Sequence, residues 1–205
     1  MVAAQLRRRG IRDERVLRAM EKVPRHLFVS YQQQASAYDD NPLPIGEGQT
    51  VSQPFIVAYM LEALQIAPEN RVLEIGSGTG YQAALLAELA REVFTIERVP
   101  TLYESARENL QRLGYSNVEV MLGDGTRGLP EKSPFDRIIV PAAAPDVPSS
   151  LFEQLVEGGR MILPVGTPEM QELLLVRKLN GLPATQQLEG CRFVPLVGEQ
   201  GFRPH

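Results

Sequence analysis

Apolar residues follow two different periods along the middle of the chain. Short apolar runs of strand length are separated by longer stretches in which apolar residues recur at the helical spacing. The runs with strand character lie at residues 71–75, 93–97, 118–123, 136–140 and 160–166. The helical stretches lie at residues 55–66, 81–90, 100–114 and 149–159. Strands that alternate with helices predict an α/β fold with a mainly parallel, doubly wound sheet that is covered on both faces.

The two ends of the chain have different patterns. Residues 1–22 show a helical pattern broken at Gly10, which predicts two short helices packed on the main domain. Residues 39–54 hold three prolines and two glycines, a composition typical of an ordered loop without a regular element. Near the C-terminus, Asn180-Gly181 lies between two apolar stretches and predicts a β-hairpin, and residues 191–197 predict a final strand.

The most informative stretch is RVLEIGSGTGYQ, at residues 71–82. Its apolar run ends in Gly76, Gly78 and Gly80, and a helical pattern follows directly. Glycine tolerates positive φ and has no side chain, so such a turn lets a ligand lie against bare backbone at the end of a strand. Alternatively, the glycines only form a sharp corner between strand and helix. The order of strand, turn and helix favours the floor of a cofactor site.

Acidic residues at the ends of the next two strands indicate what kind of cofactor fits. Glu97 lies 21 residues after Gly76, where nucleotide-binding folds place the carboxylate that binds a ribose diol. Asp124 could accept a hydrogen bond from an adenine amine, or simply form an Asp-Gly turn with Gly125. Position 81 is Tyr instead of the third glycine of a dinucleotide fingerprint, and no phosphate-loop motif occurs. Together these features indicate a nucleoside that carries no phosphate.

Ser52 has two interpretations that its residue type leaves open. It precedes the apolar helix at residues 55–66, for which Pro54 suits the first turn, so Ser52 or Gln53 can cap that helix. Ser52 can instead have a catalytic role. Residue type alone favours capping.

Composition and charge exclude several classes of function. The net charge is -4 at pH 7, and the one basic run, Arg7 to Arg9, is short, so a nucleic-acid partner is disfavoured. The single Cys191 cannot form an internal disulfide, and the chain has neither an apolar run of membrane-spanning length nor an apolar signal core. No metal-ligand spacing occurs. We expect a cytoplasmic protein without a metal, a membrane or a nucleic-acid partner.

Several motifs, in the same order along the chain, resemble one enzyme family. They are IGEGQTVSQP, VLEIGSGTGYQAALLA, GDG followed by PFDRIIVPAAAPDVP, EGGRMILPVG and RFVPLV, which together span about residues 40 to 197. A GxGxG turn marks many S-adenosylmethionine-dependent methyltransferases, whereas GQTVSQP is far more specific. In these motifs the chain is similar to the protein-L-isoaspartate (D-aspartate) O-methyltransferases of the bacterial type, whose fold is Rossmann-like.

This resemblance implies a protein-repair reaction. Such enzymes transfer the methyl group of S-adenosyl-L-methionine to the α-carboxyl of L-isoaspartyl residues in damaged proteins and peptides, and they release S-adenosyl-L-homocysteine. The methyl ester then closes to a succinimide, and hydrolysis returns part of it to normal aspartate. We expect the enzyme to be a monomer. The alternatives are a methyltransferase acting on a small molecule or RNA, and a cofactor-binding domain without catalysis.

Roles from the family carry over to the matching positions of this chain. The resemblance assigns Ser52 to catalysis and Ser52, Gln53 and Val194 to substrate binding. The cofactor-binding residues that it implies are Thr50, Val51, Ser52, Gly76, Ser77, Gly78, Glu97, Asp124 and Gly125. We expect one methyltransferase domain over residues 1–205, with a helical cap at 1–38, an active-site loop at 39–53, a cofactor-binding core at 54–164 and a C-terminal hairpin and strand at 165–205. The last residues, GEQGFRPH, differ from the family tails that close over the cofactor.

Overall fold

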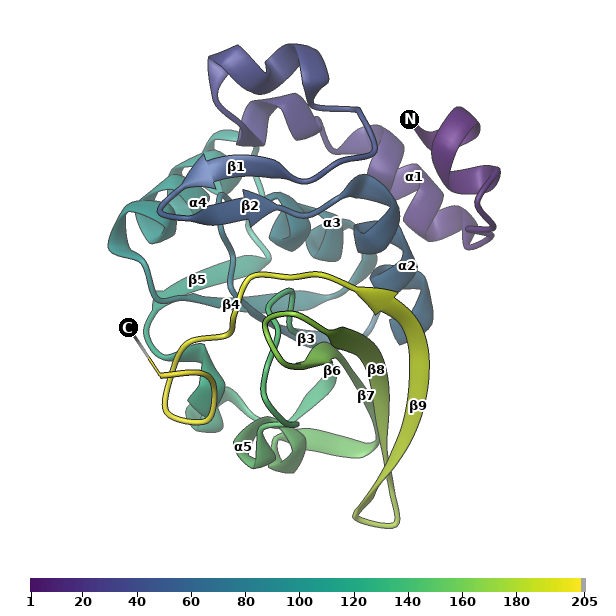
Figure 1. The fold of residues 1–205 in the computed structure, drawn as a ribbon, viewed down its shortest axis with the longest axis vertical. Coiled ribbons are helices and arrows are strands. Elements are labelled where there is room, and N and C mark those ends of the chain that lie inside the picture. Colours follow the sequence, from purple (N-terminus) through teal and green to yellow (C-terminus); the bar gives the residue numbers. More distant parts are fainter. Residues whose placement is uncertain (204–205) are drawn as a thin grey trace.

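A twisted sheet forms the centre of the molecule. The computed structural model describes residues 1–203, apart from the side chain of Cys191. Within that part of the chain, seven strands lie in the order β5-β4-β3-β6-β7-β8-β9 (Figure 1). Strands β3 to β7 are parallel, and β7, β8 and β9 pair in antiparallel fashion. Their bounds are Arg71–Ile75 (β3), Glu92–Glu97 (β4), Val118–Leu122 (β5), Phe135–Ile139 (β6), Leu155–Gly166 (β7), Gln171–Leu179 (β8) and Leu182–Cys191 (β9). The predicted α/β fold with a mainly parallel sheet is confirmed.

Apolar side chains cover both faces of this sheet. In β3, Val72 packs in one core cluster, and its neighbours Leu73 and Ile75 pack in a second cluster on the other face. All three are at most 2% exposed, which explains why the parallel strands are nearly continuous apolar runs. The helices are α1 (Glu14–Lys22), α2 (Pro54–Leu64), α3 (Tyr81–Leu89), α4 (Pro100–Arg112) and α5 (Ser149–Glu153), and the short helical turns are η1 (Val2–Arg7), η2 (Arg25–Phe28), η3 (Tyr31–Ser36), η4 (Gly125–Arg127) and η5 (Pro130–Lys132).

Helix α1 anchors the N-terminal segment on the core. Asp13 caps it, because its carboxylate accepts hydrogen bonds from the N–H groups of Arg15 and Val16. Leu17 and Met20 on its apolar face are buried in the same cluster as α2 and α3.

No helix within residues 1–203 is both long enough and apolar enough to cross a membrane.

The order of the strands reverses beside β3. From β3 the chain moves outward to β4 and β5, and it then returns to β6 on the other side of β3. Such a reversal leaves a crevice beyond the carboxyl ends of the strands, where open α/β sheets bind ligands. A small antiparallel pair, β1 (Leu43–Gly46) and β2 (Gln49–Val51), lies at this edge of the sheet, and the chain beyond β9 passes across it (Figure 1).

Three predicted elements differ from those observed. Residues 39–53 are not irregular throughout, because β1 and β2 form a hairpin whose turn, residues 46–48, has positive φ at each position. The helix predicted at 149–159 ends at Glu153, since Leu155 already pairs with Phe135 at the start of β7. The last strand expected at 191–197 is reduced to two isolated bridges, between Pro195 and Ala143 and between Val197 and Phe202, and Pro195 has no N–H with which to extend it.

Candidate active site

A pocket opens at the carboxyl ends of β3 and β4, next to the β1–β2 hairpin. Its volume is about 130 Å³. Its wall contains most of the residues singled out from the sequence, namely Thr50, Val51, Ser52, Gly76, Ser77, Gly78, Glu97, Gly125 and Val194. Gln53 and Asp124 do not belong to this wall. Segments that are far apart in the sequence therefore meet around one cavity.

The glycine turn after β3 forms the floor of the pocket. Gly78 has a φ of +54°, and a Cβ atom there would lie 3.0 Å from Cδ1 of Ile45 in β1. Gly80, with a φ of +93°, begins helix α3, and a Cβ atom would lie 3.3 Å from the backbone of Ala106 in α4. Both positions favour glycine for its left-handed conformation, and at Gly80 the close backbone of Ala106 adds to that preference.

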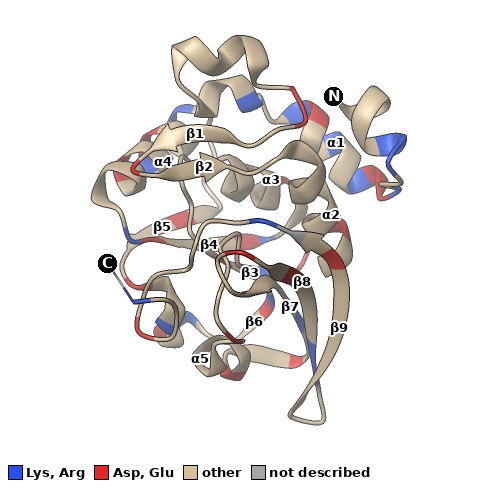
Figure 2. Cartoon of the chain, in the orientation of Figure 1, with Lys and Arg blue, Asp and Glu red and all other residues tan. Residues whose placement is uncertain are grey.

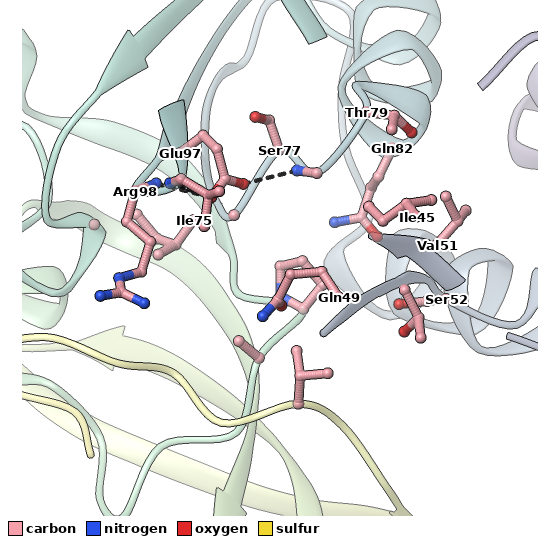
Figure 3. A pocket seen from close by; sticks show the side chains of 18 of the residues that line it. Ile45, Gln49, Val51, Ser52, Ile75, Ser77, Thr79, Gln82, Glu97 and Arg98 are labelled. Atoms are coloured by element: carbon pink, nitrogen blue, oxygen red, sulfur yellow. Dashed lines mark hydrogen bonds between the residues drawn. The ribbon is translucent and has the colours of Figure 1, made fainter. Parts of the chain in front are cut away.

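Glu97, at the end of β4, holds the glycine turn in place. Its carboxylate accepts hydrogen bonds from the N–H groups of Gly78 (2.9 Å), Arg98 (2.8 Å) and Val99 (3.0 Å). The side chain is only 5% exposed, and the dashed lines in Figure 3 mark these bonds. A carboxylate has about four acceptor positions, so one remains open for a hydroxyl group. Glu97 is therefore built into the pocket wall instead of being a solvated surface residue.

Ser52 does not cap helix α2. The N-cap residue is Gln53, whose side chain makes no capping hydrogen bond, and the Phe55 N–H donates instead to the Asp40 carboxylate at 3.0 Å. Ser52 lies at the end of β2, across the pocket from Glu97 (Figure 3). Within the described residues its hydroxyl makes no hydrogen bond. The helix-cap interpretation is wrong, and the hydroxyl is available to a ligand.

Asp124 is engaged by its own turn and by the C-terminal tail. Its carboxylate accepts hydrogen bonds from the Thr126 N–H (2.9 Å), the Thr126 hydroxyl (2.7 Å) and the Glu199 N–H (2.9 Å). Burial alone would raise the pKa of this carboxyl, but the hydrogen bonds outweigh it and hold the pKa below its ordinary value. The Asp-Gly turn proposed from the sequence is present, and Gly125 rather than Asp124 faces the pocket.

Two polar side chains are buried in the pocket wall, Ser77 at 5% and Gln82 at 7% exposed. Among the described residues the Ser77 hydroxyl has no hydrogen-bond partner, whereas the Gln82 amide faces the buried carboxyl of Glu74. An unpaired polar group costs free energy when it is buried, so the Ser77 hydroxyl suits a ligand that offers it a donor or an acceptor.

Sequence reasoning missed several wall residues. Gln82 and Arg98 line the pocket from the first turn of α3 and from just beyond β4, and Ile45 and Gln49 line it from the hairpin. Arg98 follows a strand-end acid and could have been found on that basis. For Ile45 and Gln49 there was no such signal, because the hairpin itself was not predicted.

Glu74 is a further residue that sequence reasoning passed over, although a carboxylate within an apolar strand is itself a signal. It is fully buried in β3, and its carboxyl accepts a 2.6 Å hydrogen bond from the Thr95 hydroxyl. Burial raises the pKa of Glu74 to about 7, against the lowering effect of hydrogen bonds from Thr95 and Gln82. The folded chain therefore keeps a proton here that the unfolded chain releases at much lower pH.

Stability should depend on pH through Glu74. Because the pKa is higher in the folded state, the free energy of unfolding should fall by at most about 3 kcal/mol as the pH rises from about 4.5 to 7. Above pH 7 it should level off. In Glu74→Gln this contribution should be absent, so the variant should gain stability relative to the parent protein over that interval. Denaturant unfolding across the pH range measures the difference. Equal pH dependence in the two proteins would contradict the assignment, and Glu92→Gln at the half-buried start of β4 is the matched control.

The chain matches one protein family over nearly its whole length. The family described as "Protein-L-isoaspartate(D-aspartate) O-methyltransferase (PCMT)" matches residues 1–201. A curated relative from Koribacter versatilis, named protein-L-isoaspartate O-methyltransferase, is 58% identical over 204 residues. The match covers 100% of this chain and 92% of the relative.

Two solved structures have a similar fold. A protein-L-isoaspartate O-methyltransferase has a TM-score of 0.88 at 34% identity, and the match covers 96% of this chain and 65% of that protein's chain. A Plasmodium falciparum protein described under the same enzyme name, in complex with S-adenosyl-L-homocysteine, has a TM-score of 0.81 at 28% identity over 94% of both chains. The likeness therefore includes the N-terminal helices and the C-terminal hairpin as well as the central sheet.

Proposed function

The chain belongs to the protein-L-isoaspartate O-methyltransferase family, and we propose that the pocket described above is its active site. The protein is an S-adenosylmethionine-dependent enzyme that methylates the α-carboxyl of L-isoaspartyl residues in damaged proteins. One observation supports this location of the active site. The glycine turn, Glu97 and the free Ser52 hydroxyl, which come from three different elements, face one cavity.

The residues of the wall fit S-adenosylmethionine. We propose that Ser77, which is buried and unpaired, binds its amino-acid end beside the backbone of Gly76 and Gly78. The open acceptor position of Glu97 suits a ribose hydroxyl. The adenine would lie towards Gly125, where a Cβ atom would come within 2.4 Å of Ile75, so that only glycine fits. When bound, the cofactor supplies a methyl group on a positively charged sulfur.

The direct adenine contact proposed for Asp124 is now less favoured. Its carboxylate already accepts three hydrogen bonds, and it lies outside the main pocket wall. We propose instead that Asp124 places Gly125 by holding the turn and the backbone of Glu199. This also suggests a part for the C-terminal tail, whose residue Gly198 lies so close to Asp124 that a Cβ atom would clash.

The proposed catalytic role of Ser52 is to orient the acceptor carboxylate. A carboxylate is already ionised near neutral pH, so it attacks a methyl carbon without a general base. Ser52 would donate one hydrogen bond to the carboxylate and leave the other oxygen free to react. Holding the two reacting groups in line is the main catalytic effect that such a site can supply, and well-oriented reactions gain about 7–11 kcal/mol in this way. Thr50 and Val51 would form the wall beside them.

Substrate recognition should depend on the main chain, because an isoaspartyl kink has no particular sequence. The Val194 carbonyl accepts a 2.8 Å hydrogen bond from the Ala143 N–H. The Val194 N–H has no partner among the described residues, and we propose that it pairs with the backbone of the bound peptide. Gln53, which lies next to Ser52 but outside the pocket wall, would contact the peptide only at the rim.

We also propose that the enzyme works as a cytoplasmic monomer of one domain, with no nucleic-acid partner. Two arginines of the basic run are already paired, Arg7 with Glu14 and Arg9 with Asp40. Figure 2 shows acidic and basic residues mixed along the elements of the chain. This mixture supports a protein substrate over RNA, because an RNA site needs a continuous basic surface.

A methyl-transfer assay with paired peptides tests the function. The enzyme is incubated with labelled S-adenosylmethionine and two peptides that differ only in an aspartyl or isoaspartyl residue. We expect base-labile label in the isoaspartyl peptide alone. Label in both peptides, or only in RNA, would favour another methyltransferase, and cofactor binding without any transfer would favour a binding domain.

A further inference from the structure

The tip of the β8–β9 hairpin combines a chemically reactive pair with an unusual partner. Leu179 pairs with Leu182, so Asn180 and Gly181 form a two-residue turn. Both have positive φ, +53° and +75°, as a type I′ turn requires. The carboxylate of Glu157 in β7 accepts hydrogen bonds from the N–H groups of Asn180 and Gly181, the latter at 3.0 Å. One side chain from a neighbouring strand thus holds both backbone N–H groups of the turn.

Asparagine deamidates most readily when glycine follows it, because glycine has no side chain to hinder the attack of its backbone nitrogen on the asparagine side chain. In that reaction the Gly181 nitrogen loses its proton and forms a bond to Cγ of Asn180. The bond from Cγ to the side-chain nitrogen breaks, and ammonia leaves. Water then opens the resulting succinimide at either carbonyl, which produces aspartate or isoaspartate. No electrons are gained or lost, and water is the only other reactant.

Glu157 opposes the first step of this reaction in two ways. The Gly181 N–H is already donated to a carboxylate, and removal of its proton would place a second negative charge beside the first. The paired bonds also hold the turn, whereas the attack requires the Gly181 nitrogen to move towards the Asn180 side chain. We propose that Asn180 is a deamidation site of this enzyme and that Glu157 protects it.

The damaged turn would be a substrate for a second copy of the enzyme, an extension that depends on the proposed function. Asn180 and Gly181 are exposed, as a substrate must be. Strand β8 runs antiparallel to β7, so its end lies at the edge of the sheet opposite to the carboxyl ends that form the pocket. Figure 1 shows the tip of the hairpin projecting from the molecule at that far end. The chain cannot present this turn to its own active site, and repair must occur between two molecules.

Ageing the protein without cofactor tests the protection by itself. The parent enzyme, Glu157→Gln and the matched control Glu172→Gln, which alters an exposed residue of the same hairpin, are incubated at mildly alkaline pH. Peptide mapping by mass spectrometry then measures deamidation and isoaspartate at residue 180. We expect Glu157→Gln to deamidate on the order of tenfold faster, with the parent and the control alike, because a hydrogen bond to a charged group is lost. Equal rates in all three proteins would overturn the proposal, and so would a slower rate in Glu157→Gln, which would mean that the carboxylate promotes the attack.

Repair between molecules is tested with the aged Glu157→Gln protein as substrate. Fresh parent enzyme and labelled S-adenosylmethionine should methylate it, and the aged double variant Glu157→Gln, Asn180→Gln should accept at least severalfold less label. A standard isoaspartyl peptide is included as a control. If the peptide is methylated and the damaged turn is not, self-repair is refuted while the proposed function stands. If neither is methylated, the proposed function itself has failed, and the mass spectrometry still decides on the protection by Glu157.

Discussion

Replacing Glu97 by alanine should weaken binding of S-adenosylmethionine by roughly 10²- to 10³-fold, since a hydrogen bond to a charged group contributes about 1.5–3 kcal/mol and the turn is disordered as well. The substitution removes the acceptor proposed for the ribose. It also leaves the N–H groups of Gly78, Arg98 and Val99 without their acceptor. The floor and the wall of the pocket are then affected together. Calorimetric titration with S-adenosylmethionine or S-adenosylhomocysteine measures the affinity.

The two carboxylates of β4 provide an internal comparison. Glu92, at the start of the strand, is paired with Arg71 and lies far from the pocket, so Glu92→Ala should leave cofactor affinity unchanged. Glu97→Gln should be nearly as harmful as Glu97→Ala. An amide has only one acceptor oxygen, and its NH₂ group would face a backbone N–H. Unchanged affinity in Glu97→Ala would show that the cofactor does not bind along this wall.

Replacing Ser52 by alanine should lower kcat/KM for an isoaspartyl peptide by about 10²-fold, the effect of losing one hydrogen bond to a charged carboxylate and its alignment. Activity should not vanish, because the nucleophile is the carboxylate of the substrate and Ser52 only directs it. The affinity for S-adenosylmethionine should change little, since the glycine turn and Glu97 are untouched. Steady-state kinetics with the paired peptides separates these effects.

Stability measurements on the same variant distinguish catalysis from helix capping. The N-terminus of α2 is held by Asp40, so Ser52→Ala should melt at the same temperature as the parent protein. Ser36→Ala, at an exposed position of η3, is the matched control for loss of a serine hydroxyl. Full activity combined with a lower melting temperature would remove Ser52 from the site and restore its role as a cap.

Some of the proposed roles could be read from short stretches of sequence. The strand, the glycine turn and helix α3 follow one another within residues 71–89, so their arrangement depends on local patterns alone. The position of Glu97 at the end of the next strand is equally local. Such features appear in the sequence because element type depends on periodicity, and glycine at a turn depends on backbone conformation.

Other features could not be read in this way. Whether Ser52 caps a helix depended on Asp40, a residue 12 positions earlier that reaches the same N–H group. The position of Asp124 depended on the backbone of Glu199, which arrives from the far end of the chain. In both cases the sequence left two interpretations open, because the competing partner lay outside any local pattern.

The amino-acid sequence by itself determined the kind of fold and the glycine floor after β3, since each depends on residues close together along the chain. It also determined the family resemblance, because each motif is a short stretch and the motifs occur in a fixed order. The tertiary structure decided which side chains face the pocket and which are already engaged elsewhere. It placed the unpaired Ser77 hydroxyl in the wall, and it brought the Glu157 carboxylate to the N–H groups of Asn180 and Gly181. Such pairings depend on packing between distant segments, and no local period records them.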